Sequence, residues 1–264
     1  MTATDATIEI VDAAVARGRT TVLTIGELRL GAGHTAVVGP NGSGKSTLLH
    51  AIAGLLPVAG SVRVLGATPG THRARVAYVM QTQHASEHLL VTANEVVSLG
   101  RAAVRGPFAR FTRDDRRAVR RSMERLDVAD LGRRHLAEMS GGQRQRIFVA
   151  QGLAQEADVL LLDEPVAGLD LPSMQLIRDV IAEERAAGRT IVVATHDLAD
   201  AARADNVVLL DRRVIADGPP ASALTPANLR AAYGGRVLDL GDGLVAIDDG
   251  VHHDDHEHHH HDHD

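Results

Sequence analysis

Short runs of apolar residues, many of them β-branched, recur along the chain and stop at turn residues, a pattern typical of β-strands. The segments predicted to be strands are 7–11, 20–25, 35–38, 61–65, 75–80, 159–162, 191–194, 207–210 and 214–216, and 240–244 is predicted to be a hairpin turn. The segments 159–162 and 191–194 are apolar throughout, which indicates burial on both faces of a sheet.

Helical spacing of apolar residues fills several of the intervals between these strands. Helices are predicted over 46–52, 92–99, 113–127 and 173–187, with two more beginning at Ser140 and Thr225. Thr92, followed three positions later by Glu95, fits a capping box. Thr112 and Asp115 repeat that spacing before the next helix. Because strand and helix alternate over 158–211, the chain is predicted to have an α/β fold with a parallel sheet.

Composition narrows the class of protein. The 264 residues include 2% aromatic residues and no cysteine, so we expect an aliphatic core without disulfides or thiolate metal sites. No apolar run is long enough to cross a bilayer, and the acidic N-terminus does not fit a signal peptide, so a cytosolic protein is expected. The net charge of −6 gives no indication of nucleic-acid binding.

The strand at 35–38 runs into a glycine-rich loop that fits G-x-x-x-x-G-K-[ST]. The loop and the first helical residues are Gly39, Pro40, Asn41, Gly42, Ser43, Gly44, Lys45, Ser46 and Thr47. Backbone N–H groups of such a loop, together with the positive end of the next helix, can surround phosphate groups. Lys45, the chain's only lysine, supplies a positive charge, and the Ser46 hydroxyl is a suitable ligand for Mg²⁺. This predicts nucleoside triphosphate binding.

Two carboxylates, Asp163 and Glu164, end the apolar strand at 159–162. Since successive side chains of a strand point to opposite faces, the two acids should point different ways. One can then support Mg²⁺ while the other orients and deprotonates an attacking water, the two roles that phosphoryl transfer requires.

A second glycine pair follows a serine cap at Ser140, Gly141, Gly142 and Gln143. The exposed N–H groups at this positive helix end can bind an anion. Because the chain has one phosphate loop and one such surface, a head-to-tail homodimer would place each surface on the partner's nucleotide.

Taken together, these motifs resemble the nucleotide-binding subunit of an ATP-binding-cassette (ABC) transporter over about residues 7–235. Ser140 to Gln143 match the signature sequence of that family, with Met139 where leucine is usual. Gln81 matches its Q-loop glutamine, and 167–170, which ends at Asp170, matches its D-loop. His196 matches its switch histidine.

The resemblance implies a RecA-like P-loop core with an antiparallel β subdomain and an inserted helical subdomain at about 82–155, all within residues 1–247. It implies ATP and Mg²⁺ as ligands, with Ser46, Gln81 and Asp163 holding the metal ion. Glu164 would be the general base, and His196 would contact the γ-phosphate. Ser140 and Gly142 would act across the dimer.

One departure from the family pattern concerns adenine. The family usually stacks adenine on an aromatic residue upstream of the phosphate loop, and the comparable place here is near Arg17. A guanidinium can stack on a base, so Arg17 is the predicted substitute.

Residues 248–264 are predicted to form a disordered tail rich in histidine and acid. The histidines are His252, His253, His256, His258, His259, His260, His261 and His263. Imidazole and carboxylate together suit Zn²⁺ and similar ions, so a metal-binding tail is the favoured interpretation. An expression tag or a solubilising tail is the alternative, although acidic residues interrupt the histidines.

Within the ABC family, residues 78–101 and 143–165 resemble subunits of metal and metal-chelate importers, zinc and manganese importers above all. The expected protein is therefore an ATPase at the cytoplasmic face of the membrane. It would act with two permease subunits and an extracytoplasmic metal-binding protein. An iron-chelate importer, a soluble ABC protein without a transporter and a metal buffer are the rival interpretations.

Overall fold

A computed structural model describes residues 7–80, 90–106, 109–234, 237–241 and 244–247, with side chains described up to residue 234. A central sheet runs through it in the order β5-β6-β7-β3-β8-β9. Its strands are β3 (Gly33–Val38), β5 (Val76–Val79), β6 (Val159–Asp163), β7 (Thr190–Ala194), β8 (Asn206–Leu210) and β9 (Val214–Gly218). Only the last pair, β8 with β9, is antiparallel. The predicted parallel α/β sheet is confirmed.

A second sheet is antiparallel, in the order β2-β1-β4. Its strands are β1 (Ile8–Arg17), β2 (Thr20–Leu30) and β4 (Ala59–Val64). The first two are longer than the predicted 7–11 and 20–25. Pairs such as Val15 with Leu23 continue the ladder. The register of β1 shifts between Val15 and Ala16 against β2, and between Val11 and Ala14 against β4.

Eight α-helices, several of them short, complete the described part of the chain. They are α1 (Lys45–Ala53), α2 (Ala93–Arg105), α3 (Arg113–Arg125), α4 (Gly141–Ala154), α5 (Leu171–Ala186), α6 (Leu198–Ala201), α7 (Pro220–Ala223) and α8 (Pro226–Tyr233). The capping boxes at Thr92 and Thr112 are present, and Ser140 forms a third. A β10–β11 hairpin (Val237–Gly241, Leu244–Ile247) follows α8, around the predicted turn.

Helix α2 runs past Gly100, beyond its predicted end at Leu99. A β-carbon at Gly100 would lie 2.2 Å from the carbonyl oxygen of Gln151 in α4. The glycine therefore allows two helices to pack closely and does not end the first one.

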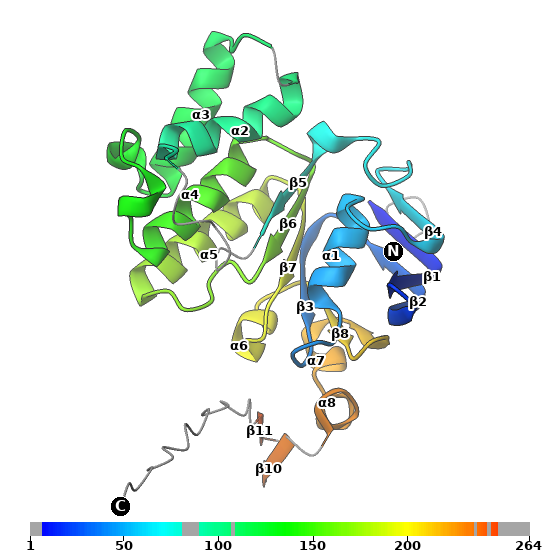
Figure 1. Ribbon diagram of the computed structural model, residues 1–264. Helices are drawn as coiled ribbons and strands as arrows, with labels where there is room; N and C mark the ends of the chain where they lie inside the picture. Colours follow the sequence, from blue (N-terminus) through cyan, green and yellow to red (C-terminus); the bar gives the residue numbers. More distant parts are fainter. Residues whose placement is uncertain (1–6, 81–89, 107–108, 235–236, 242–243, 248–264) are drawn as a thin grey trace, which may run out of the picture.

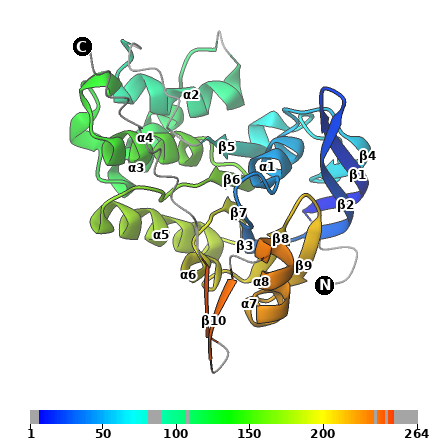
Figure 2. The same ribbon diagram turned by 60° about the horizontal axis from the view of Figure 1, so that its bottom comes forward.

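The central sheet separates two apolar layers, and strand β6 contributes to both. Leu160 and Leu162 pack with α2 to α5, whereas Val159 and Leu161 pack with α1 and the three-stranded sheet. Figures 1 and 2 show α4 and α5 on one side of the sheet and α1 with β1, β2 and β4 on the other. The ends of β3 and β6, where the phosphate loop and the two acids follow, are thus held by packing on both faces.

A buried carboxylate fixes the start of α3. Asp115 is fully buried and accepts hydrogen bonds from the backbone N–H (2.8 Å) and hydroxyl (2.7 Å) of Thr112. It also accepts from Arg101 (2.9 Å) and Arg105 (3.1 Å), so α2 and α3 share it. Burial alone would raise the pKa of Asp115, but the bonds from Thr112, Arg105 and Arg101 hold it well below its usual range.

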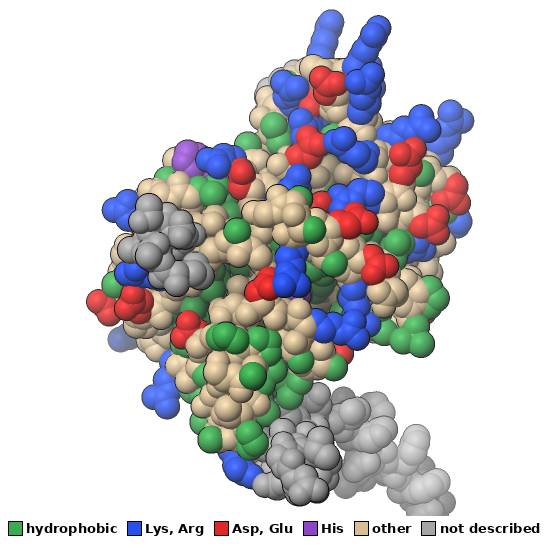
Figure 3. Space-filling model, turned by 180° about the vertical axis from the view of Figure 1, so that it is seen from behind, with side chains coloured by type: hydrophobic (Ala, Val, Ile, Leu, Met, Phe, Trp, Pro, Cys, Tyr) green, Lys and Arg blue, Asp and Glu red, His purple; other side chains and the backbone are tan. Residues whose placement is uncertain are grey.

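Replacing Asp115 with alanine would leave the buried Arg101 without its main partner. We expect Asp115→Ala to lower the free energy of unfolding by about 3–5 kcal/mol, measured by urea denaturation. The neighbouring Asp114 provides the control, because its ion pair with Arg117 is long (3.5 Å) and exposed. Figure 3 shows such exposed basic and acidic side chains together on the surface of this part of the molecule. We therefore expect Asp114→Ala to lower the free energy of unfolding by under about 1 kcal/mol. Equal decreases in both variants would contradict the assignment of Asp115 as the buried partner of Arg101.

Candidate nucleotide-binding and catalytic site

The phosphate loop connects β3 to α1 by a backbone path that requires glycine at its first position. Gly39 has φ +155°, and a β-carbon there would lie 2.1 Å from the carbonyl oxygen of Leu210. The loop can therefore pack against the end of β8 only without a side chain.

Lys45 opens α1 with its side chain folded over this loop. Its ammonium group donates to the carbonyl oxygens of Gly39 (2.8 Å) and Pro40 (3.2 Å), and the residue is only 7% exposed. The hydroxyl of Ser43 is buried and makes no hydrogen bond with any other described residue. A fixed positive charge beside an unused hydroxyl suits an anionic, oxygen-rich ligand such as a nucleoside triphosphate.

A cavity of about 280 Å³ joins the loop to the predicted catalytic acid. It is lined by Arg17, Val22, Asn41, Gly42, Ser43, Gly44, Lys45, Ser46, Thr47 and Glu164. Arg17 lies at the end of β1 and lines this cavity. Its stacking on adenine stays a prediction.

The two acids at the end of β6, Asp163 within the strand and Glu164 directly after it, differ in environment, as strand alternation predicts. Asp163 is 5% exposed, and its carboxylate accepts a hydrogen bond from the hydroxyl of Tyr78 at 3.3 Å. Glu164 instead lines the cavity of the phosphate loop. Its φ of +47° is left-handed, and its N–H donates to the carbonyl oxygen of Ala194 at 2.9 Å. Such a backbone in a non-glycine residue costs roughly 1–3 kcal/mol and is frequent at functional sites.

His196 follows β7 on the same edge of the sheet. Its Nδ1 lies 3.8 Å from a carboxylate oxygen of Glu164, and its side chain is half exposed. Two segments more than thirty residues apart in sequence thus bring the predicted base and the switch histidine together.

The predicted signature residues, Ser140 to Gln143, lie outside the phosphate-loop cavity. Ser140 caps α4, where its hydroxyl accepts from the N–H of Gln143 at 3.2 Å. Gly141 and Gly142 form the first turn, and none of these four residues lines the phosphate-loop cavity. Asp170 caps α5 by accepting from the N–H of Ser173. The hydrogen bond from the Ser173 side chain, and secondly this backbone bond, lowers the pKa of Asp170.

Two groups of predicted ligands fall outside the described residues: Gln81 and the tail histidines His252 to His263. Within the described residues, no three His, Cys, Asp or Glu side chains are placed to hold a metal ion together. The helices of this described part are all too short or too polar to cross a bilayer.

The sequence patterns gave no role to Tyr78 and His50, yet Tyr78 contacts the predicted site residue Asp163 and His50 contacts Tyr78. The hydroxyl of Tyr78 is 2.9 Å from Nε2 of His50 as well as bonded to Asp163. Alternation along β5 was the available signal, because it places Tyr78 on the opposite face from the buried Ala77 and Val79.

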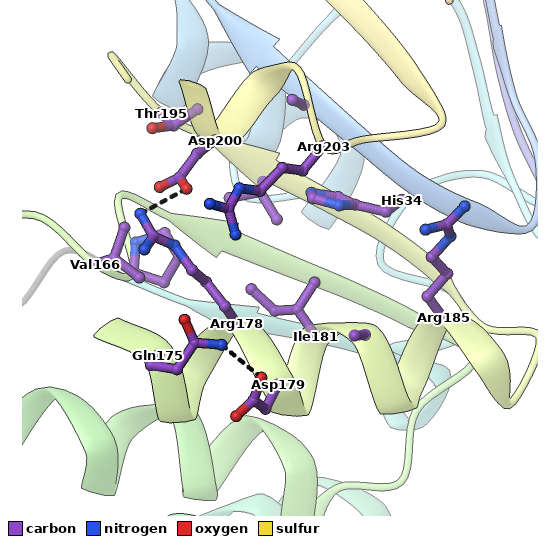
Figure 4. Close-up of a pocket in the computed structure, with 14 residues that line it drawn as sticks. His34, Val166, Gln175, Arg178, Asp179, Ile181, Arg185, Thr195, Asp200 and Arg203 are labelled. Carbon is purple, nitrogen blue, oxygen red and sulfur yellow. Dashed lines mark hydrogen bonds and ion pairs between the residues drawn. The ribbon is translucent and has the colours of Figure 1, made fainter. Parts of the chain in front are cut away.

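A second cavity, of about 250 Å³, lies between α5, α6 and the strands β3 and β7 (Figure 4). Arg178 and Asp200 form an ion pair of 2.6 Å across it. Burial lowers the pKa of His34 to about 4, so this wall residue is neutral at neutral pH. The cavity touches Val166 and Thr195, the neighbours of the Glu164 and His196 segments.

The chain resembles known proteins over most of its length. A family model described as ABC transporter matches residues 27–167. The zinc transport system ATP-binding protein TroB of Treponema pallidum (strain Nichols) is 41% identical over 204 residues, which cover 76% of this chain and 77% of that protein. The manganese transport system ATP-binding protein MntB of Halalkalibacterium halodurans is 38% identical over 202 residues, covering 76% and 81%.

A solved structure agrees with these relatives. The structure of cbiO1 from Clostridium perfringens, part of the ABC transporter complex cbiONQ, has a TM-score of 0.70 and 25% identity, covering 86% of this chain and 94% of that one. The RecA-like core with its antiparallel sheet is therefore the fold of ABC ATPases, which use ATP and Mg²⁺. With the phosphate loop, the two acids and His196 in the order and geometry described, the chain belongs to the ABC transporter family, as one of its ATP-hydrolysing subunits.

Proposed function

We propose that this subunit uses ATP hydrolysis to drive import of a divalent metal ion, zinc in the first place. The observation that carries the ATPase part is the single cavity that contains both Lys45 and Glu164. Zinc is supported by the 41% identity to a zinc transport ATP-binding protein and by the histidine-rich tail sequence. Manganese is the nearest alternative, because a manganese relative is 38% identical. An iron-chelate importer and a soluble ABC ATPase remain further alternatives.

The proposed roles of the residues are those that the family resemblance implies, and the shared cavity of the phosphate loop and Glu164 supports them. The loop from Gly39 to Thr47 binds the phosphates, with Lys45 as their positive charge. Glu164 accepts the proton of the attacking water, and His196, beside it, contacts the terminal phosphate. Ser46, Asp163 and Gln81 are the proposed Mg²⁺ ligands, and the ion neutralises charge on the phosphates when bound.

The second half of each site comes from another copy of the chain. Ser140 and Gly141 are exposed, and the Ser140–Gln143 turn does not line the cavity of its own chain. The capping box uses the N–H groups of Ser140 and Gln143, whereas those of Gly141 and Gly142, at a positive helix end, suit the terminal phosphate of a nucleotide held by a partner. We therefore assign a head-to-tail homodimer in which ATP lies between the two chains.

Transport itself requires further subunits. The proposed assembly places the dimer at the cytoplasmic face of the membrane, held by two permease subunits and supplied by an extracytoplasmic metal-binding protein. The transported ion is tested by cellular uptake in a strain that lacks this gene, with radioactive zinc, manganese and chelated iron offered separately. Return of zinc uptake with the wild-type gene, but not with Glu164→Gln, would support the proposal. Return of manganese or iron uptake alone would overturn the zinc assignment.

The tail prediction concerns residues 252–264, outside the described part. Eight histidines among carboxylates offer several ligand sets, none of them preformed, so the affinity for zinc should be moderate. Because imidazole must be neutral to bind metal, zinc binding should weaken as the pH falls below about 6.5. Removing residues 252–264 should abolish most zinc binding and leave basal ATPase activity intact. Calorimetric titration of both forms checks this, and equal binding by the two would refute a metal-binding tail.

A further inference from the structure

The hydroxyl of Tyr78 connects three elements around the site. Tyr78 belongs to β5, and its hydroxyl donates to Oδ2 of Asp163 at the end of β6. The same oxygen lies 2.9 Å from Nε2 of His50 on α1. The two rings meet edge to face, with centroids 5.2 Å apart and an angle of 75° between their planes. These contacts form one hydrogen-bonded chain from α1 through β5 to β6.

The chemistry of the phenol fixes the direction of this chain. A phenol has one hydrogen, and here Asp163 receives it. The oxygen of Tyr78 must therefore accept from His50, which requires the tautomer of His50 with hydrogen on Nε2. An unperturbed phenol has a pKa of about 10, so Tyr78 keeps its hydrogen at neutral pH.

The chain of contacts reaches the residues that hold the nucleotide. His50 lies on α1, five positions after Lys45, and the first two residues of that helix are Lys45 and Ser46. Tyr78 thus ties one oxygen of the Asp163 carboxylate to the helix carrying two other members of the site. A carboxylate held in this way keeps one rotamer, which is the usual effect of a hydrogen-bond partner behind a metal ligand.

We propose that Tyr78 is a positioning residue that fixes the Asp163 carboxylate for the Mg²⁺ of bound ATP, with His50 as the support of its hydroxyl. This rests on the proposed role of Asp163. In this proposal Tyr78 contacts neither the phosphates nor the reacting water. Its replacement should therefore change the affinity for the metal ion more than the affinity for the nucleotide.

The test uses Tyr78→Phe, which removes one oxygen and keeps the ring. Mn²⁺ stands in for Mg²⁺, and its affinity for the complex of protein and AMP-PNP is measured by electron paramagnetic resonance. Loss of the supporting hydrogen bond should weaken Mn²⁺ binding about 10-fold. Binding of fluorescent ATP in EDTA should not change. His50→Leu should weaken Mn²⁺ binding in the same direction but less.

Tyr233→Phe is the matched control. Tyr233 is the only other tyrosine in the sequence, is 7% exposed and lies on α8, away from the phosphate-loop cavity. It should leave Mn²⁺ affinity unchanged, which separates a general effect of losing a buried hydroxyl from the proposed one.

Asp163→Asn separates the proposed positioning by Tyr78 from the proposed binding of the metal ion by Asp163. If Asp163→Asn weakens Mn²⁺ binding and Tyr78→Phe does not, positioning by Tyr78 is refuted and the metal site stands. If Asp163→Asn has no effect on Mn²⁺ affinity, the assignment of Asp163 as a metal ligand fails as well.

Discussion

Glu164→Gln should reduce ATP turnover by about 10²–10⁴-fold, because loss of a positioned general base typically costs that much. The amide has nearly the shape of the carboxylate, so the left-handed backbone at this position, the Asp163 carboxylate and Lys45 should stay in place. ATP should therefore still bind, and the protein should accumulate as a dimer that traps ATP. Steady-state phosphate release and size-exclusion chromatography with ATP measure the two effects.

Glu156→Gln controls for the chemical change. Glu156 also has a left-handed backbone, with φ +54°, but pairs with Arg101 and Arg121 and does not line the cavity. ATP turnover by the Glu156→Gln variant should stay close to that of the wild type. Near-normal turnover in Glu164→Gln would remove Glu164 from the role of base.

Ser140→Arg should abolish ATP hydrolysis while leaving the affinity of the isolated monomer for ATP almost unchanged. Ser140 is exposed at the start of α4. In the proposed homodimer, the arginine would occupy the space of the terminal phosphate held by Lys45 of the other copy. Fluorescent ATP binding at low protein concentration and turnover at high concentration separate the two effects. Ser61→Arg, the same change at an exposed serine of β4, should alter neither.

Mixing Ser140→Arg protein with Lys45→Ala protein tests action across the dimer directly. Each protein alone lacks a complete site, but one site of the mixed dimer combines an intact Lys45 with an intact Ser140. Hydrolysis should return on mixing. If Ser140→Arg eliminates ATP binding by the monomer, or if mixing restores nothing, Ser140 does not act in trans.

Local patterns predicted most of the elements, because the forces that form them act over a few residues. The capping boxes at Thr92 and Thr112 formed where their spacing indicated, since side chain and backbone partners lie within one helical turn. The apolar strand 159–162 was buried on both faces, as its composition required. Boundaries were less reliable: α2 continued past Gly100 because α4 packs against it.

The site divides in the same way. The sequence by itself determined the phosphate loop, since glycines, Lys45 and Ser46 are adjacent in the chain and their spacing is specific. It also determined that two acids follow the apolar segment 159–162. The resemblance to the ABC family supplied the roles of Gln81, Asp170 and His196, which no local pattern provides. Those roles, and that of Arg17, stay predictions.

Only the tertiary structure decided which residues meet. His196 lies close to Glu164 because β6 and β7 are neighbours in the sheet. The sequence of either strand alone does not determine which strand lies next to it. Tyr78, His50 and Asp163 come from three elements and are up to 113 positions apart in the sequence. The sequence indicates that a buried hydroxyl needs a hydrogen-bond partner, but it does not identify that partner. The left-handed backbone of Glu164 likewise depends on its bond to Ala194, a contact that long-range packing imposes on a residue whose own preference opposes it.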